Sequence, residues 1–271
     1  MRFSALALVL ACLLPLLSAV TSNARAQDVS NQGLVEAFDL VVFGREYKDQ
    51  KASRLIRWDR PLKIAILGKG YPPEFESQIV DHLRDLSLET GLAINLAYSE
   101  GLRAAGRLPK SYRRTPFNMV LFWAPKAELP AMVEKYTKGV FKAADTARLS
   151  GEGMCHGRAI NSKKTGAFTF AYAAFAAEVA TQTKYGNRLV DPKKFLATCI
   201  VEETTQLMGL PNDVSDLEWS LFNDKNKVLE LSDPDRWLLR VLYDDRMKPG
   251  LPNAEALKLA AKILAEKRPG K

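Results

Sequence analysis

Four polar residues in the C-terminal half of the chain have types and a spacing that could support hydrolytic chemistry. Glu202, Gln206 and Asn212 follow one another at intervals of four and six positions, and Glu203 directly follows the first of them. On a helix, positions i and i+4 share a face, so Glu202 and Gln206 can be directed at a common point. Gly209 can turn the chain so that Asn212 returns towards that point. Glu203 lies next to Glu202 in the sequence, and its carboxylate is suited to act as a general base near that point.

This segment resembles the zinc-binding motif of the metzincin proteases, H-E-x-x-H-x-x-G-x-x-H. In that family the three histidines hold the zinc, and the glutamate activates the metal-bound water. The histidine positions are occupied here by Glu202, Gln206 and Asn212, whereas the general base and the glycine are kept as Glu203 and Gly209. The resemblance predicts a zincin-like fold that has lost its zinc ligands, with Glu203 as the candidate catalytic residue.

The altered positions favour oxygen ligands over a zinc site. Carboxylates and amides, including Asp213 beside Asn212, suit hard cations such as calcium, magnesium or manganese, and this set would bind them weakly. Of the two histidines, His82 is expected at a helix surface or boundary, and His156 could approach the motif only through a disulfide at Cys155. We therefore expect no metal and no cofactor, with a weakly held hard cation as the alternative.

Three functional interpretations remain open from these residues. The favoured one is a non-catalytic binding protein. The second is an active hydrolase in which Glu203 is the general base, either of a peptidase without zinc or of a glycan-cleaving enzyme. The latter needs two carboxyls about 5–10 Å apart, for which Glu202, Glu203 and Asp213 are candidates. The third is a structural protein in which the polar residues form a core network.

The motif must be positioned by a helix that begins at Asp191-Pro192, an acidic N-cap followed by proline at the first helical position. The helix is expected to span about 192–208 and to end at Gly209. Its apolar face is predicted from Phe195, Leu196, Cys199, Ile200 and Leu207. The same arc includes Glu203 and Gln206, with Glu202 at its edge, so these polar groups are expected to need buried partners.

Downstream residues extend the metzincin resemblance. Ser220-Leu221-Phe222 occupies the place of the family's methionine turn, with Phe222 in the position of the methionine. Leu231 to Tyr243 resembles the final helix of matrixin-type members. The resemblance covers Phe195 to Tyr243 and implies a common frame for this part of the fold.

The remaining periodicities predict a single α+β domain with a mixed sheet packed on helices. Helices are expected over 32–43, 73–90, 129–136, 234–242 and 254–267, and strands over 62–67, 92–98, 117–123 and 167–177. The expected organisation is a signal peptide over 1–26, an N-terminal helical segment over 27–50, a zincin-like domain over 51–250 and a C-terminal helix over 251–271.

Residues 1–26 have the features of an export signal. Arg2 gives a positive start, an apolar run extends from Phe3 to Val20, and Ala24-Arg25-Ala26 fits a small-residue cleavage site. A membrane anchor is the alternative, which Pro15 and the cleavage site disfavour. We expect cleavage there and a periplasmic or secreted protein without an integral membrane span.

Cys155 and Cys199 are the cysteines that remain after cleavage, and in an exported protein such a pair predicts a disulfide. The bond would close a loop of about 44 residues and stabilise the fold by about 3–4 kcal/mol. The functional alternative is a reactive thiol at Cys155 with His156 as its base.

The chain carries a formal net charge of +8, spread along its length. Its densest basic group consists of Arg103, Arg107, Lys110, Arg113 and Arg114. This group could meet an acidic envelope component, although a solvated loop is the simpler interpretation. No nucleic-acid-binding module accompanies it. We expect an envelope protein, a peptide or a cell-wall component as the partner, and no nucleic acid.

The chain also resembles a family of exported, mainly proteobacterial proteins that is known only as a domain of unknown function. The elements that carry this resemblance are Arg57-Trp58, Cys199 to Asp213, Ser220 to Asp224 and Leu238 to Gly250. The resemblance implies a bacterial envelope protein and assigns no activity.

Overall fold

The computed structural model describes residues 29–45, 51–109, 116–144, 153–181, 183–185, 188–223, 228 and 230–271. The predicted signal peptide lies outside the described residues, as do Lys110, Arg113 and Arg114 of the basic group. Arg103 and Arg107 of that group are exposed, and Arg103 forms an ion pair with Glu100.

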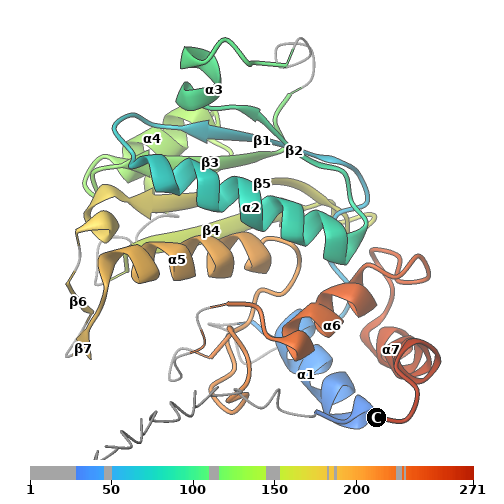
Figure 1. Ribbon diagram of the computed structural model, residues 1–271. Helices are drawn as coiled ribbons and strands as arrows, with labels where there is room; N and C mark the ends of the chain where they lie inside the picture. Colours follow the sequence, from blue (N-terminus) through green and yellow to red (C-terminus); the bar gives the residue numbers. More distant parts are fainter. Residues whose placement is uncertain are drawn as a thin grey trace, which may run out of the picture.

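A five-stranded mixed sheet forms one layer of the fold (Figure 1). Its strands lie in the order β2 (Ile94–Tyr98), β1 (Leu62–Leu67), β3 (Met119–Ala124), β5 (Phe168–Ala176) and β4 (Cys155–Asn161). The first four strands are parallel, and β4 runs antiparallel to β5 at the edge of the sheet. The central strand β3 is buried along its whole length, which explains its continuous apolar sequence.

The two faces of the sheet pack against different helices. Successive residues of β3 point to opposite faces of the sheet. Leu121 therefore belongs to the larger apolar cluster, and Phe122 belongs to a separate, smaller one. The larger cluster joins the sheet to α2 (Pro73–Thr90) and α5 (Pro192–Gln206). The smaller one lies under α4 (Leu129–Tyr136). The short α3 (Glu100–Ala104) follows β2 directly.

Three helices extend the larger cluster away from the sheet, as Figure 1 shows. They are α1 (Asn31–Phe43), α6 (Asp233–Leu242) and α7 (Asn253–Lys267), and α1 contacts both of the others. Segments from the two ends of the described chain therefore share one core with the sheet. Among the described residues, no helix is long and apolar enough to cross a bilayer.

The structure is an α+β fold with a mixed sheet packed on helices, as predicted. The five helices expected outside the motif and the four expected strands are all present, with ends within two residues of those predicted. The motif helix ends at Gln206, earlier than expected, and a turn follows it. The sequence reasoning missed β4, α3, a 3₁₀ helix at Ala177–Ala180 and the hairpin of β6 (Lys184–Tyr185) with β7 (Arg188–Leu189).

Candidate functional site

The motif helix α5 begins where its sequence predicts, and the predicted glycine turn follows its end. Asp191 accepts hydrogen bonds from the backbone N–H groups of Lys193 and Lys194 at 2.9 and 3.1 Å. At the other end, Gly209 adopts a φ of +112°, and a Cβ there would lie 2.7 Å from the carbonyl oxygen of Ile56. Glycine is therefore required both by the backbone conformation and by the close passage of the preceding chain.

The edge strand β4 lies along α5 and is joined to it covalently. Cys155 and Cys199 form a disulfide with 5.9 Å between their Cα atoms, as predicted. Two residues along β4, a Cβ on Gly157 would lie 2.9 Å from Oε2 of Glu203. The carboxylate of the candidate general base thus lies directly against the backbone of the edge strand at Gly157.

Gln206 and Asn212, two of the predicted site residues, make bonds within the fold. Gln206 Nε2 donates to Oδ1 of Asp213 at 2.9 Å, so the structure brings these two predicted site residues together. Asn212 Nδ2 donates to the carbonyl oxygen of Leu40 at 2.9 Å. That carbonyl lies in the last turn of α1 and also accepts from the backbone N–H of Gly44. Asn212 therefore caps α1.

The buried polar stripe of α5 differs from the predicted one. Glu202, Glu203 and Gln206 are half-buried, whereas the fully buried polar residues are Thr204 and Thr205. Both threonine hydroxyls donate to carbonyls one turn earlier in the helix, which satisfies them without distant partners. The motif's polar groups thus lie at the margin of the buried face, and the threonines occupy its centre.

The two histidines lie on different sides of the site. His82 is buried in α2, and its Nε2 lies 3.0 Å from the Thr205 hydroxyl, so its prediction as a surface or boundary residue was wrong. Burial lowers the pKa of His82 to about 4. His156 follows Cys155 on β4, and its ring faces Tyr172 on the opposite side of the sheet from α5. Strand alternation therefore directs His156 away from the motif.

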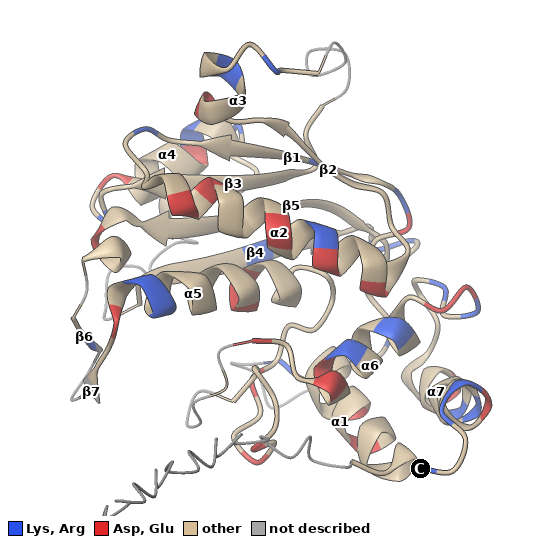
Figure 2. Ribbon diagram, in the orientation of Figure 1, with Lys and Arg blue, Asp and Glu red and all other residues tan. Residues whose placement is uncertain are grey.

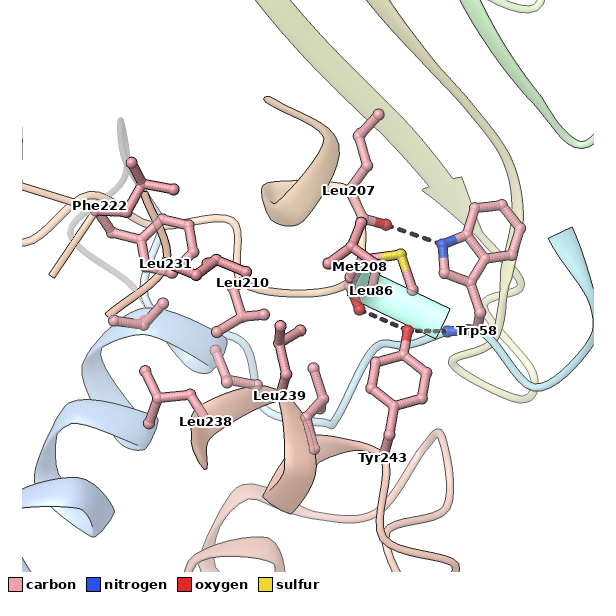
Figure 3. Packing of buried hydrophobic residues seen from close by; sticks show 14 of the residues in the cluster. Trp58, Leu86, Leu207, Met208, Leu210, Phe222, Leu231, Leu238, Leu239 and Tyr243 are labelled. Carbon is pink, nitrogen blue, oxygen red and sulfur yellow. Dashed lines mark hydrogen bonds between the residues drawn. The ribbon is translucent and has the colours of Figure 1, made fainter. Parts of the chain in front are cut away.

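The carbonyl groups at the end of α5 are bound by residues from both sides of it in the sequence (Figure 3). Trp58 Nε1 donates to the carbonyl oxygen of Leu207 at 2.9 Å, and the Tyr243 hydroxyl donates to that of Met208 at 2.7 Å. Burial raises the pKa of Tyr243, and the Arg57 guanidinium stacks 5.0 Å from its ring centre. These bonds replace the partners that a helix end otherwise lacks.

Asp235 links the start of α6 to the turn that resembles the methionine turn. Its fully buried carboxylate accepts from the Ser220 hydroxyl at 2.7 Å, from Leu221 N–H at 3.0 Å, and from both the backbone and side chain of Ser232. Burial raises the pKa of this carboxyl above its ordinary value. The next residue in the turn, Phe222, is fully buried. The carboxylate thus orders the turn that places Phe222 in the core.

We predict that Asp235→Asn lowers the free energy of unfolding by about 2–3 kcal/mol, because an amide N–H₂ then faces buried donors. Urea denaturation followed by circular dichroism measures the change. The matched control is Asp233→Asn, an exposed residue in the first turn of the same helix. Its expected loss is below about 1 kcal/mol. Equal losses in the two variants would contradict a special role for the buried carboxylate.

The chain around the motif is acidic although the protein is basic. Between Phe195 and Asn223 the sequence contains no Lys or Arg, and its carboxylates are Glu202, Glu203, Asp213, Asp216 and Glu218. Figure 2 shows basic residues at the start of α5 and acidic residues further along it. Within the described part of the chain, no three His, Cys, Asp or Glu side chains are grouped so that they could hold a metal ion.

A family model described as "Protein of unknown function (DUF2927)" matches residues 31–262, from α1 into α7. No match was found among curated proteins or among solved structures. The matched region includes every residue of the candidate site and both cysteines of the disulfide.

Proposed function

Since the chain belongs to the DUF2927 family of proteins of unknown function, we propose that it is an exported envelope protein with a zincin-like fold that binds a ligand without cleaving it. The observation that carries this proposal is the bond from Asn212 to Leu40 in α1. The third ligand position of the metzincin frame serves here as a helix cap. The second position, Gln206, is likewise engaged with Asp213.

The zincin-like part of the proposal is supported by the surroundings of α5. The helix packs on a mixed sheet beside its edge strand, and its glycine turn is kept. The turn at Ser220-Leu221-Phe222 directs Phe222 into the core, where the resembling family has its methionine. Export is supported by the predicted signal and by the disulfide, since structural disulfides persist in oxidising compartments.

We infer that the ligand is an extended peptide that adds to β4. Among the described residues, β4 pairs with β5 on one side and with no strand on the other. A strand at the edge of a sheet can pair with a further strand through its backbone donors and acceptors. Oε2 of Glu203 lies against the β4 backbone at Gly157, so an added peptide would pass close to this carboxylate. The acidic character of the motif region favours a neutral or cationic peptide over an anionic one.

Metal analysis and a peptidase assay on the purified mature protein test the loss of zinc catalysis. After incubation with zinc, calcium, magnesium and manganese in turn, and removal of free metal, we expect zinc well below one ion per chain. We also expect no cleavage of a mixed peptide library. Stoichiometric zinc together with chelator-sensitive cleavage would overturn the proposal. Peptides retained from the same library by the immobilised protein would identify the ligand.

A hydrolase that uses Glu203 is the second candidate, favoured by the position of this carboxylate over Gly157. A strand added at β4 would pass beside it, as a general base requires. If the protein cleaves any library peptide, Glu203→Gln should abolish turnover while the thermal midpoint stays near that of the wild type. Asp216→Asn, an exposed carboxylate in the same acidic stretch, is the matched control and should keep activity. Unchanged turnover in Glu203→Gln excludes this candidate.

A further inference from the structure

The junction between α2 and α5 is built around one buried histidine. His82 faces α5, where it meets the hydroxyl of Thr205 at 3.0 Å. That hydroxyl donates its only proton to the carbonyl oxygen of Val201 at 2.6 Å. It must therefore accept from His82, which places a proton on Nε2 of the ring. His82 and Thr205 are 123 positions apart in the sequence, so their contact joins two helices from distant parts of the chain.

Burial is what opposes a second proton on the ring of His82. Among the neighbouring charges, Asp85 on α2 favours the imidazolium, and Arg236 from α6 disfavours it to a smaller extent. Arg236 donates to Asp85 at 2.7 Å and to Glu89 at 2.9 Å, so the attraction of Asp85 for His82 is partly compensated. From α5, the groups that meet His82 are the Thr205 hydroxyl and the Val201 carbonyl, and neither titrates.

A protonated His82 would thus be a buried cation beside Arg236 in a junction of three helices. Such a charge is costly to bury without a dedicated partner. One helical turn earlier, the buried Oε1 of Gln78 has no hydrogen-bond donor within the described part of the chain. The Gln78 carbonyl oxygen is therefore a buried acceptor that would gain access to a donor when the helices separate.

We propose that the His82–Thr205 contact is an acid-sensitive junction that releases the C-terminal half of α5 from α2 when His82 is protonated. The residues nearest the released segment are Gln206 and the turn to Asn212. The disulfide at Cys199 lies one to two turns earlier and keeps the middle of the helix on β4. The proposal concerns the packing of α5 and holds whether or not the motif binds a peptide.

The direction in which stability depends on pH follows from the shift in the pKa of His82. The pKa of His82 falls from 6.5 to about 4 in the folded state, because burial disfavours the charged ring. The unfolded chain therefore takes up a proton at a higher pH than the folded one. Stability is full above pH 6.5 and declines as the pH falls towards 4. At about pH 5 the unfolding constant is expected to be roughly 20-fold higher than at about pH 7 from this residue alone.

The raised pKa of the buried Asp235 carboxyl acts in the opposite direction, because the folded chain takes up that proton before the unfolded one. The ion-paired carboxylates Asp85 and Asp244 titrate below this window. Arg236 holds the pKa of Asp85 below its usual range, and Arg246 does the same for Asp244. A carboxyl with a lowered pKa contributes stability that is present above its unfolded value of 3.8 and is lost only below it. Measurements at about pH 5 therefore report the histidine before these ion pairs weaken.

Hydrogen exchange and urea unfolding of the full mature chain at about pH 7.5 and about pH 5 test the proposal. After correction for intrinsic exchange rates, we expect amides of residues 200–210 to lose more protection at acid pH than those of α7. His82→Gln keeps a donor for Thr205 but cannot titrate, so its response to acid should be greatly reduced. His156→Gln removes the other histidine of the chain and should respond like the wild type.

Two results would overturn the proposal: a wild-type response to acid in His82→Gln, or an equal loss of protection across all helices. If His82→Gln does not fold, the wild-type protein still decides the question. A nuclear magnetic resonance titration should then show His82 as the neutral Nε2–H form with a pKa well below 6.5. A His82 pKa at or above 6.5 would exclude an acid-sensitive junction at the His82–Thr205 contact.

Discussion

Replacing Trp58 by alanine is expected to lower the free energy of unfolding by about 4 kcal/mol. Trp58 is fully buried, its ring packs against Phe168 with 5.3 Å between ring centres, and its Nε1 donates to the Leu207 carbonyl. The substitution removes the largest side chain at the centre of the core and also leaves a buried carbonyl at the end of α5 without its donor. Both losses act on the turn that follows the motif helix.

Chemical denaturation monitored by circular dichroism measures this effect, and Trp58→Phe separates its two parts. Phenylalanine keeps most of the ring but has no N–H, so its expected loss is about 1–2 kcal/mol. Exchange of the Met208 and Gly209 amides should quicken in both variants. A loss for Trp58→Ala no larger than that for Trp58→Phe would show that packing of the indole contributes little.

Removal of the disulfide is expected to cost about 4 kcal/mol, because the oxidised unfolded chain is constrained by a bond between residues 44 positions apart. The double variant Cys155→Ala, Cys199→Ala should therefore unfold at a much lower urea concentration than the oxidised wild type. It should also allow β4 to separate from α5, since the bond is the covalent link between them. The thermal midpoint should fall in parallel.

Reductant supplies the matched control for this prediction. Reduced wild-type protein should approach the stability of the double variant, and reductant should leave the variant itself unchanged. Mass spectrometry after alkylation should show no free thiol at Cys155 or Cys199 in the oxidised protein. A reactive thiol at Cys155 that alkylates without reductant would contradict the disulfide and restore the alternative in which His156 acts as its base.

Local signals in the sequence account for most of the predicted elements. The Asp191-Pro192 start of α5 and the glycine after α2 act through neighbouring residues, so they could be recognised without the fold. β4 could not be recognised in the same way. Its sequence, Cys-His-Gly-Arg-Ala-Ile-Asn, shows no apolar alternation, because every residue of this edge strand is half-buried or exposed. The position of β4 is set by its pairing with β5 and by the disulfide to α5, so its own sequence needs no alternation of apolar and polar residues.

The helix and the turn that form the candidate site could be predicted from the sequence, but the side-chain contacts within the site could not. The spacing of the motif predicted the helix and the turn at Gly209, since both depend on residues close in sequence. The bond of Asn212 to Leu40 joins residues 172 positions apart, and that of His82 to Thr205 joins residues 123 positions apart. No periodicity reports such pairings. For this reason His82 was assigned to a surface or boundary, and the roles of Trp58 and Tyr243 at the end of α5 were missed.

The two donors that close the end of α5 have a consequence for the order in which the protein is built. Trp58 comes long before the motif in the chain, and Tyr243 comes well after it. A chain that emerges from its N-terminus onwards can form α5 and meet Trp58 while the Met208 carbonyl still lacks its partner. The turn is completed only when α6 has arrived. The motif region is therefore among the last parts of the protein to reach its final form during synthesis.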